Sequence, residues 1–220
     1  AISVYNEFDV DELGVIDIYA SREGRSFDTE LLRGISEECK TPLFAGGGIS
    51  SLDDIEQLLK NGAEKVLLSS KIIESPDFLQ EATNQFGTSS IIVCLDCIPT
   101  SFNQFNIYNS KTKLVTEYEV NAFIKHLQNF GLGECIVQSI AKDGHMNGYD
   151  QQLISTALDG TCIPIIALGG CSSITEISVM AKSFDLSAYA SGSIFSFYNS
   201  DREVLINYPN LNFLNTLIQK

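Results

Sequence analysis

Two segments of the chain carry the same glycine-rich pattern followed by serine. The first is Gly46-Gly47-Gly48-Ile49-Ser50-Ser51, and Gly169-Gly170-Cys171-Ser172-Ser173 repeats it 122 positions later. Glycine lets backbone amides approach an anion closely, and the helix that follows directs its positive end at the same point. The strand after each copy ends in serine, at Ser70 and at Ser193. We therefore expect two phosphate sites, and a natural ligand that carries a phosphate at each end.

Two carboxylates are placed where they could act as acid and base. Asp96 closes the apolar run Ile91-Ile92-Val93-Cys94-Leu95, where a charge is costly unless it is paired or used. Asp143 lies in the loop Ala141-Lys142-Asp143-Gly144-His145. Facing carboxylates can divide general acid and general base roles. The alternatives are that Asp96 only accepts hydrogen bonds from loop amides, and that Asp143-Gly144 is only a turn.

Short apolar runs alternate with amphipathic helical patterns and must position these residues. The expected strands are 12–18, 42–45, 65–69, 91–96, 134–139, 163–168 and 187–192, with helices such as 28–38, 52–60, 119–130, 151–158 and 174–183. This alternation is typical of a parallel sheet covered by helices. The internal repeat favours closure into a (β/α)₈ TIM barrel of two half-barrels, with residues 1–220 as one domain. We expect 96–116 to be one long loop.

Other polar residues gather at the two ends of such a barrel. Chemistry sits at the carboxyl ends of the strands, where we also place Asp17, Gln138 and Ser139 as further residues of the mouth. Asp17 could instead only cap the loop that follows it. Glu12, Lys65 and Glu134 each begin a strand, so they should meet at the opposite end. Three charged residues around one opening suggest a polar gate into the barrel axis, although solvation of strand starts would explain any one of them.

The expected strands number seven, whereas the barrel has eight. The chain begins at Ala1 in what reads as the later part of a helix, with Ile2, Tyr5 and Phe8 on one stripe. We therefore expect that a first strand, its loop and part of its helix, roughly 30–40 residues by barrel proportions, are absent from this sequence.

Composition excludes several classes of partner. The formal net charge is −14 and the pI about 4.4, which disfavours binding to nucleic acid or to an anionic membrane. We expect no membrane span and no signal peptide. The six cysteines lie in apolar, strand-like surroundings without a histidine cluster, so reduced thiols of a cytoplasmic protein fit better than a metal site. We expect neither a metal nor a cofactor.

Four motifs, spread over nearly the whole chain, resemble the cyclase subunit of imidazole glycerol phosphate synthase. They are Asp11-Glu12-Leu13-Gly14-Val15-Ile16-Asp17-Ile18-Tyr19-Ala20-Ser21, Gly46-Gly47-Gly48-Ile49, Asp143-Gly144-His145-Met146-Asn147-Gly148-Tyr149-Asp150 and Pro164-Ile165-Ile166-Ala167-Leu168-Gly169-Gly170. The Gly148-Tyr149-Asp150 triplet favours this subunit over the sister isomerase barrel of histidine synthesis.

The resemblance implies a lyase of histidine biosynthesis. A glutaminase docked at the barrel bottom would release ammonia, which passes up the axis and joins a bis-phosphorylated aminoimidazole nucleotide. By the same resemblance Asp96 is one of two principal catalytic aspartates and Asp143 a supporting carboxylate. The implied phosphate sites are Gly48, Ser69 and Ser70 on one side and Gly170, Gly192 and Ser193 on the other, and the implied ammonia gate contains Glu12, Lys65 and Glu134.

Departures from the family leave alternatives open. By the resemblance, the second catalytic aspartate, the flexible substrate loop and the arginine of the gate belong to the first strand, which we expect to be absent from this sequence. The usual Asp-Arg-Asp-Gly reads Ala141-Lys142-Asp143-Gly144 here. Residues 190–196 and 204–209 resemble a paralogous branch that supplies ammonia for sugar amidination in surface-polysaccharide synthesis. A phosphosugar isomerase barrel of the Amadori type is a third interpretation, which the gate residues argue against.

Overall fold

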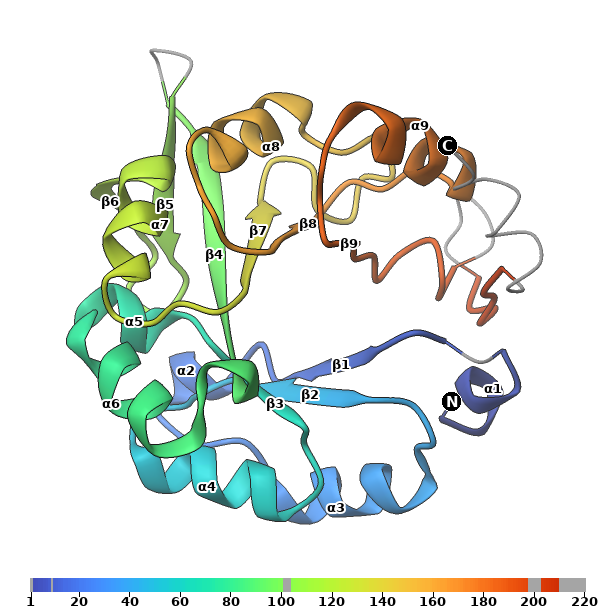
Figure 1. Cartoon of the computed structure of the whole chain (residues 1–220). Helices are drawn as coiled ribbons and strands as arrows, with labels where there is room; N and C mark the ends of the chain where they lie inside the picture. Colours follow the sequence, from blue (N-terminus) through green and yellow to red (C-terminus); the bar gives the residue numbers. More distant parts are fainter. Residues whose placement is uncertain (1, 9, 101–103, 198–202, 210–220) are drawn as a thin grey trace.

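The computed structural model describes residues 2–8, 10–100, 104–197 and 203–209. Seven strands pair in parallel in the order β1-β2-β3-β4-β7-β8-β9. Their bounds are β1 Leu13–Ile16, β2 Leu43–Gly46, β3 Lys65–Leu68, β4 Ile91–Pro99, β7 Cys135–Ser139, β8 Ile165–Leu168 and β9 Ala188–Tyr189. The sheet curls, with β1 to β3 on one side, β7 to β9 on the other and β4 between them (Figure 1). The predicted α/β fold of the (β/α)₈ barrel type is confirmed.

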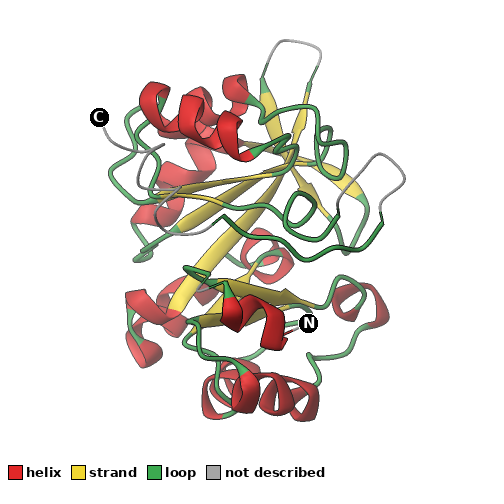
Figure 2. Ribbon diagram, turned by 90° about the vertical axis from the view of Figure 1, so that its right-hand side faces the viewer, coloured by secondary structure: helices red, strands yellow, loops and turns green. Residues whose placement is uncertain are grey.

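Helices alternate with these strands and cover the outside of the sheet (Figure 2). The longer ones are α3 Thr29–Glu38, α4 Leu52–Lys60, α6 Asp77–Phe86, α7 Val120–Gln128, α8 Gln151–Leu158 and α9 Ile174–Ser183. The shorter ones are α1 Ile2–Glu7, α2 Ala20–Glu23, α5 Ser70–Glu74 and the 3₁₀ turn Thr88–Ser90. The predicted bounds of α4, α8 and α9 are confirmed to the residue, because Ser51, Asp150 and Ser173 cap their first turns.

The prediction of one long loop over 96–116 is wrong. β4 continues past Asp96 to Pro99 and pairs in antiparallel fashion with β5 (Phe105–Asn109), which pairs in turn with β6 (Leu114–Glu119). The alternation of buried and half-buried residues along β5 was hidden by the Asn- and Ser-rich composition around it. Packing of Phe105 and Ile107 against the core outweighs that polar composition.

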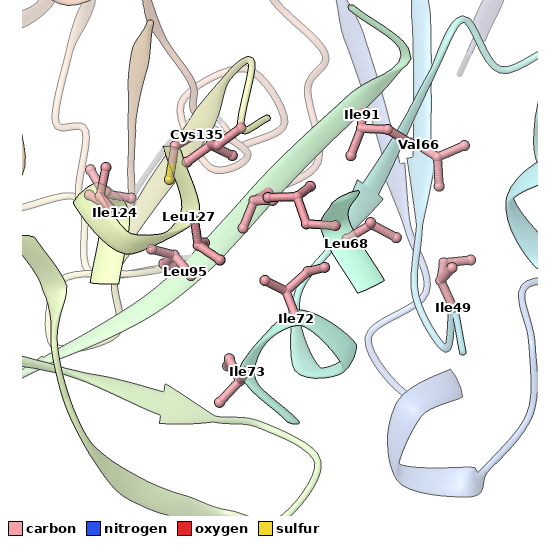
Figure 3. Close-up of a cluster of buried hydrophobic side chains, with 14 of the residues drawn as sticks. Ile49, Val66, Leu68, Ile72, Ile73, Ile91, Leu95, Ile124, Leu127 and Cys135 are labelled. Atoms are coloured by element: carbon pink, nitrogen blue, oxygen red, sulfur yellow. The ribbon is translucent and has the colours of Figure 1, made fainter. Parts of the chain in front are cut away.

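Two layers of core define which side of each strand faces the barrel interior. The larger layer joins strand residues to helix residues and therefore lies outside the sheet, as Figure 3 shows for Leu68, Ile72, Leu95, Ile124 and Leu127. The smaller layer consists of strand residues and lies inside: Leu67, Ile92, Cys94, Ile136 and Ile166. Because side chains alternate along a strand, Asp96 shares the inner side with Ile92 and Cys94. Cys97 belongs to the larger layer and therefore faces the opposite side.

β1 and β9 are the outer strands of the parallel sheet. Among the described residues, β1 pairs with β2 alone and β9 with β8 alone. The strand expected before Ala1 stays a prediction.

All six cysteines, which lie in the described part of the chain, are free thiols. Within that part, no helix is both long and apolar enough to cross a membrane.

Candidate functional site

The carboxyl ends of the seven parallel strands bring the predicted mouth residues to one edge of the sheet. At the centre lies Asp96 on β4, largely buried and hydrogen bonded by the Ser110 hydroxyl from the turn after β5. Burial raises the pKa of Asp96 above its ordinary value. The Ser110 hydrogen bond and the charge of Arg22 oppose that rise, while the charge of Asp143 adds to it. Asp96 therefore holds its proton to a higher pH than an exposed carboxyl does.

The next strand, β7, places an amide beside this carboxyl. Gln138 is the register partner of Asp96, so both side chains occupy the inner side of the barrel. The Nε2 of Gln138 donates to Oδ2 of Asp143 at 3.2 Å, which ties the exposed Asp143 to the mouth. Ser139, also expected in the mouth, is buried on the other side, and its hydroxyl donates to Oδ2 of Asp150 at 3.2 Å. Ser139 therefore hydrogen bonds to the N-cap residue of α8 and does not face the mouth.

Asp17 organises the loop after β1. Its Oδ1 accepts hydrogen bonds from the backbone amides of Tyr19 and Ala20, at 3.0 and 3.1 Å. Its Oδ2 pairs with Nη1 of Arg25 at 2.6 Å. The Arg25 hydrogen bond is the main reason that the pKa of Asp17 is lowered. The structure therefore supports the alternative in which Asp17 caps its own loop.

The first glycine-rich turn, after β2, lies against that same loop. Gly48 has φ +71°, which favours glycine, and a methyl group there would lie 2.0 Å from the carbonyl oxygen of Arg25. The Gly48 amide donates to Oγ of Ser21 at 3.1 Å. Ser69 and Ser70 follow the neighbouring β3, and Ser70 is buried as the first residue of α5. We name this group the first cradle: Gly48, Ser69 and Ser70.

The second glycine-rich turn, after β8, borders a small polar hollow. Gly169 and Gly170 have φ +95° and +94°. A methyl group at Gly170 would lie 2.4 Å from the carbonyl oxygen of Gly148. Gly170, Gly192 and Ser193 line the hollow together with Asp143, Gly144, Met146, Gly169, Cys171 and Ser191. The structure thus collects the three predicted phosphate residues of this half, which we name the second cradle, beside the carboxylate of Asp143.

Three polar residues of the mouth were missed by sequence reasoning. Ser110 was hidden in the segment read as one loop. Arg22 donates from Nε to the Ser110 carbonyl at 3.3 Å, and its exposed position on α2 gave no signal. Ser21 could have been found, because it precedes Asp143 by the same 122 positions that separate the glycine-rich segments.

At the opposite end of the sheet, three charged residues form one ion-paired group. Nζ of Lys65 lies 3.1 Å from Oε1 of Glu12 and 3.0 Å from Oε2 of Glu134. The side chains are 22–28% exposed. Burial lowers the pKa of Lys65, but the hydrogen bonds and charges of the two glutamates outweigh it, so the pKa is raised overall. The raised pKa therefore keeps Lys65 charged and paired with both glutamates at neutral pH.

Comparison with known proteins gives consistent results. The family model described as histidine biosynthesis protein matches residues 1–201. A relative from Vibrio vulnificus, provisionally named imidazole glycerol phosphate synthase subunit hisF3, is 37% identical over 213 residues, which are 95% of this chain and 81% of the relative. The imidazole glycerol phosphate synthase subunit HisF of Dictyoglomus turgidum is 32% identical over 193 residues, 88% of this chain and 76% of the relative.

Proposed function

Because the chain belongs to the histidine biosynthesis protein family, and within it to the HisF cyclase subunits of imidazole glycerol phosphate synthase, we propose that it uses ammonia to close an imidazole ring. The substrate is a phosphoribulosyl aminoimidazole nucleotide with a phosphate at each end. The products are imidazole glycerol phosphate and an aminoimidazole carboxamide ribotide, and the condensation with ammonia releases one water.

The observation that carries this proposal is the buried carboxyl of Asp96. It lies on the central strand β4, inside the barrel, and burial raises its pKa. A raised pKa brings a carboxyl closer to the pH range in which a general acid or base works. Asp143 is the second carboxylate of the mouth, and its charge acts on Asp96. We assign proton transfer at the reacting centre to Asp96, and support of that centre to Asp143.

The two cradles hold the ends of the substrate. Gly48 and Gly170 follow β2 and β8, on opposite sides of β4 in the strand order. A phosphate on each cradle would place the middle of the ligand over the central strand. Binding energy gained at the two ends is then available to fix the reacting atoms near Asp96.

Ammonia enters from the other end of the barrel. We assign to Lys65, Glu12 and Glu134 the role of a gate, and to the surface around them the docking of a glutaminase subunit. An ion-paired ring can hold itself closed, and a docked subunit could shift it to admit a small neutral molecule. The chain would then work in the cytoplasm as one subunit of a two-protein enzyme.

A second candidate is delivery of ammonia to another enzyme, as in sugar amidination. The observation that favours it is Ala141, which stands where the family resemblance calls for a further mouth carboxylate. In this case the chain would retain the gate and the glutaminase partner but would not catalyse ring closure.

The test uses the purified protein with ammonium salt and the bis-phosphorylated aminoimidazole nucleotide. A cyclase releases both products with ammonium alone, and with glutamine once a glutaminase subunit is added. Lys65→Met should lower the glutamine-dependent rate severalfold more than the ammonium-dependent rate. Consumption of glutamine without ring closure would favour the delivery function, and equal loss with both nitrogen sources would make Lys65 structural.

A further inference from the structure

Each glycine-rich turn is followed by a helix whose first turn carries a carboxylate. Asp54 lies in α4, after the turn that contains Gly48, and Glu176 lies in α9, after the turn that contains Gly170. The two are 122 positions apart, the same offset as between Gly48 and Gly170. Both accept more hydrogen bonds than capping of a helix needs.

The Asp54 carboxylate joins two loops of the first half. Its Oδ2 accepts from the amides of Ser50 and Ser51, both at 2.9 Å, and from both hydroxyls at 3.0 Å. Its Oδ1 accepts from the hydroxyl of Ser26 at 2.6 Å. Ser26 belongs to the loop after β1, the strand that precedes β2 along the chain. Asp54 therefore ties the glycine-rich turn to the loop that Gly48 packs against.

Glu176 makes the equivalent connection in the second half. Its Oε2 accepts from the amide of Ser172 at 2.8 Å and from the Ser172 hydroxyl at 2.7 Å. Its Oε1 accepts from the amide of Tyr149 at 2.7 Å. Tyr149 belongs to the loop after β7, next to Gly148, whose amide donates to the Gly170 carbonyl at 2.7 Å. The carboxylate again ties the turn after one strand to the loop after the preceding strand.

We propose that Asp54 and Glu176 are the positioning residues of the two cradles, fixing the glycine-rich amides in the geometry that receives a phosphate. This rests on the assignment of the cradles under the proposed function. An anion is bound well by amides only if they already point at one place, since reorganisation on binding reduces affinity. A carboxylate linking both walls of the turn supplies that preorganisation, and charge-assisted hydrogen bonds are stronger than neutral ones.

The test compares Asp54→Asn and Glu176→Gln with a matched capping variant. Asp28 caps α3 by accepting from the amides of Glu30 and Leu31. Its substitution, Asp28→Asn, alters a helix cap outside both cradles. Each protein is titrated with inorganic phosphate by calorimetry, and its free energy of unfolding is measured in urea.

We expect the unmodified protein to bind two phosphates. Asp54→Asn and Glu176→Gln should each weaken one of the two sites about tenfold, a typical effect of losing a hydrogen bond to a charged group. The double variant should weaken both sites. Asp28→Asn should change phosphate affinity less than twofold, whatever it does to stability.

Three outcomes would overturn the proposal. Affinities within twofold of the unmodified protein in both carboxylate variants would show that the cradles do not depend on Asp54 and Glu176. Equal weakening by Asp28→Asn would reduce the effect to general destabilisation. Failure of the unmodified protein to bind phosphate would remove the cradles and this inference together. Since no assay here requires turnover, absence of cyclase activity would contradict the proposed function alone.

Discussion

The two halves of the barrel share one backbone frame but carry different side chains on it. Gly47 in the first half and Gly169 in the second lie over equivalent strand-end residues, Asp17 and Ser139. Gly48 and Gly170 likewise press on the loop after the preceding strand. One equivalent pair of loop positions, Ser21 and Asp143, illustrates the difference. Ser21 accepts the hydrogen bond of the Gly48 amide, whereas Asp143 is bonded to Gln138.

This difference separates the residues that the repeat places in both halves from the residues that the proposed reaction needs in one place. The repeated glycines and capping residues build the same kind of turn at equivalent places in the two halves. Gln138 and Asp143 break the repeat, because Ile16 and Ser21 stand at the equivalent positions, whereas Asp96 and Ser110 have no equivalent among the described residues. We therefore expect substitutions of repeated residues to have matched effects in both halves, and substitutions of the unmatched residues to act on turnover.

The largest effect should come from Asp96→Asn. Removal of a general acid or base should lower turnover with ammonium on the order of 10²-fold or more. The fold should persist, because an asparagine can still accept the Ser110 hydrogen bond. Steady-state kinetics with the bis-phosphorylated substrate measure the effect. Turnover near that of the unmodified protein would reject the catalytic role.

A smaller effect, equal in both halves, should follow from Gly48→Ala and Gly170→Ala. Both glycines have positive φ, and a methyl group at either would meet a carbonyl oxygen. Backbone strain alone should cost roughly 1–3 kcal/mol of unfolding free energy in each case. Gly34→Ala in α3 is the control, since a methyl group there meets nothing within 4 Å. It should stabilise the helix by about 0.5–1 kcal/mol. Urea unfolding of all three variants measures these free energies. A clearly larger loss for Gly48→Ala or for Gly170→Ala alone would contradict the expected equality of the two halves.

The smallest effect concerns stability and pH at Asp96. Because its folded-state pKa is raised, its stabilising contribution is present below the ordinary value of 3.8 and is lost as pH rises through the folded-state pKa. At pH values above that folded-state pKa the ionised carboxylate is therefore unfavourable, and there Asp96→Asn should raise Tm. A gain of roughly 2–4 °C corresponds to 1 kcal/mol in a domain of this size. The gain in Tm should shrink as the pH is lowered. If Asp96→Asn instead had a lower Tm than the unmodified protein at pH 7, the surroundings of Asp96 would be shown to stabilise its charge.

Sequence reasoning predicted the repeated frame well, because that frame depends on local signals. Ser51 and Ser173 cap helices in the same pattern, and apolar strands alternate with those helices. Ser110 could not be predicted, since it reaches Asp96 only through a hairpin held by tertiary packing of Phe105 and Ile107. Ser139 was assigned to the mouth because it lies at the end of its strand. Strand alternation places its side chain on the outside, since Gln138 next to it points inward.

The central claim is that a bis-phosphorylated ligand spans the two cradles over Asp96. The most direct measurement is a crystal structure of the protein soaked in inorganic phosphate. We predict one phosphate at Gly48 and Ser70 and a second at Gly170 and Ser193, on either side of β4. A phosphate at one cradle alone, or phosphates only at other places on the surface, would contradict the claim.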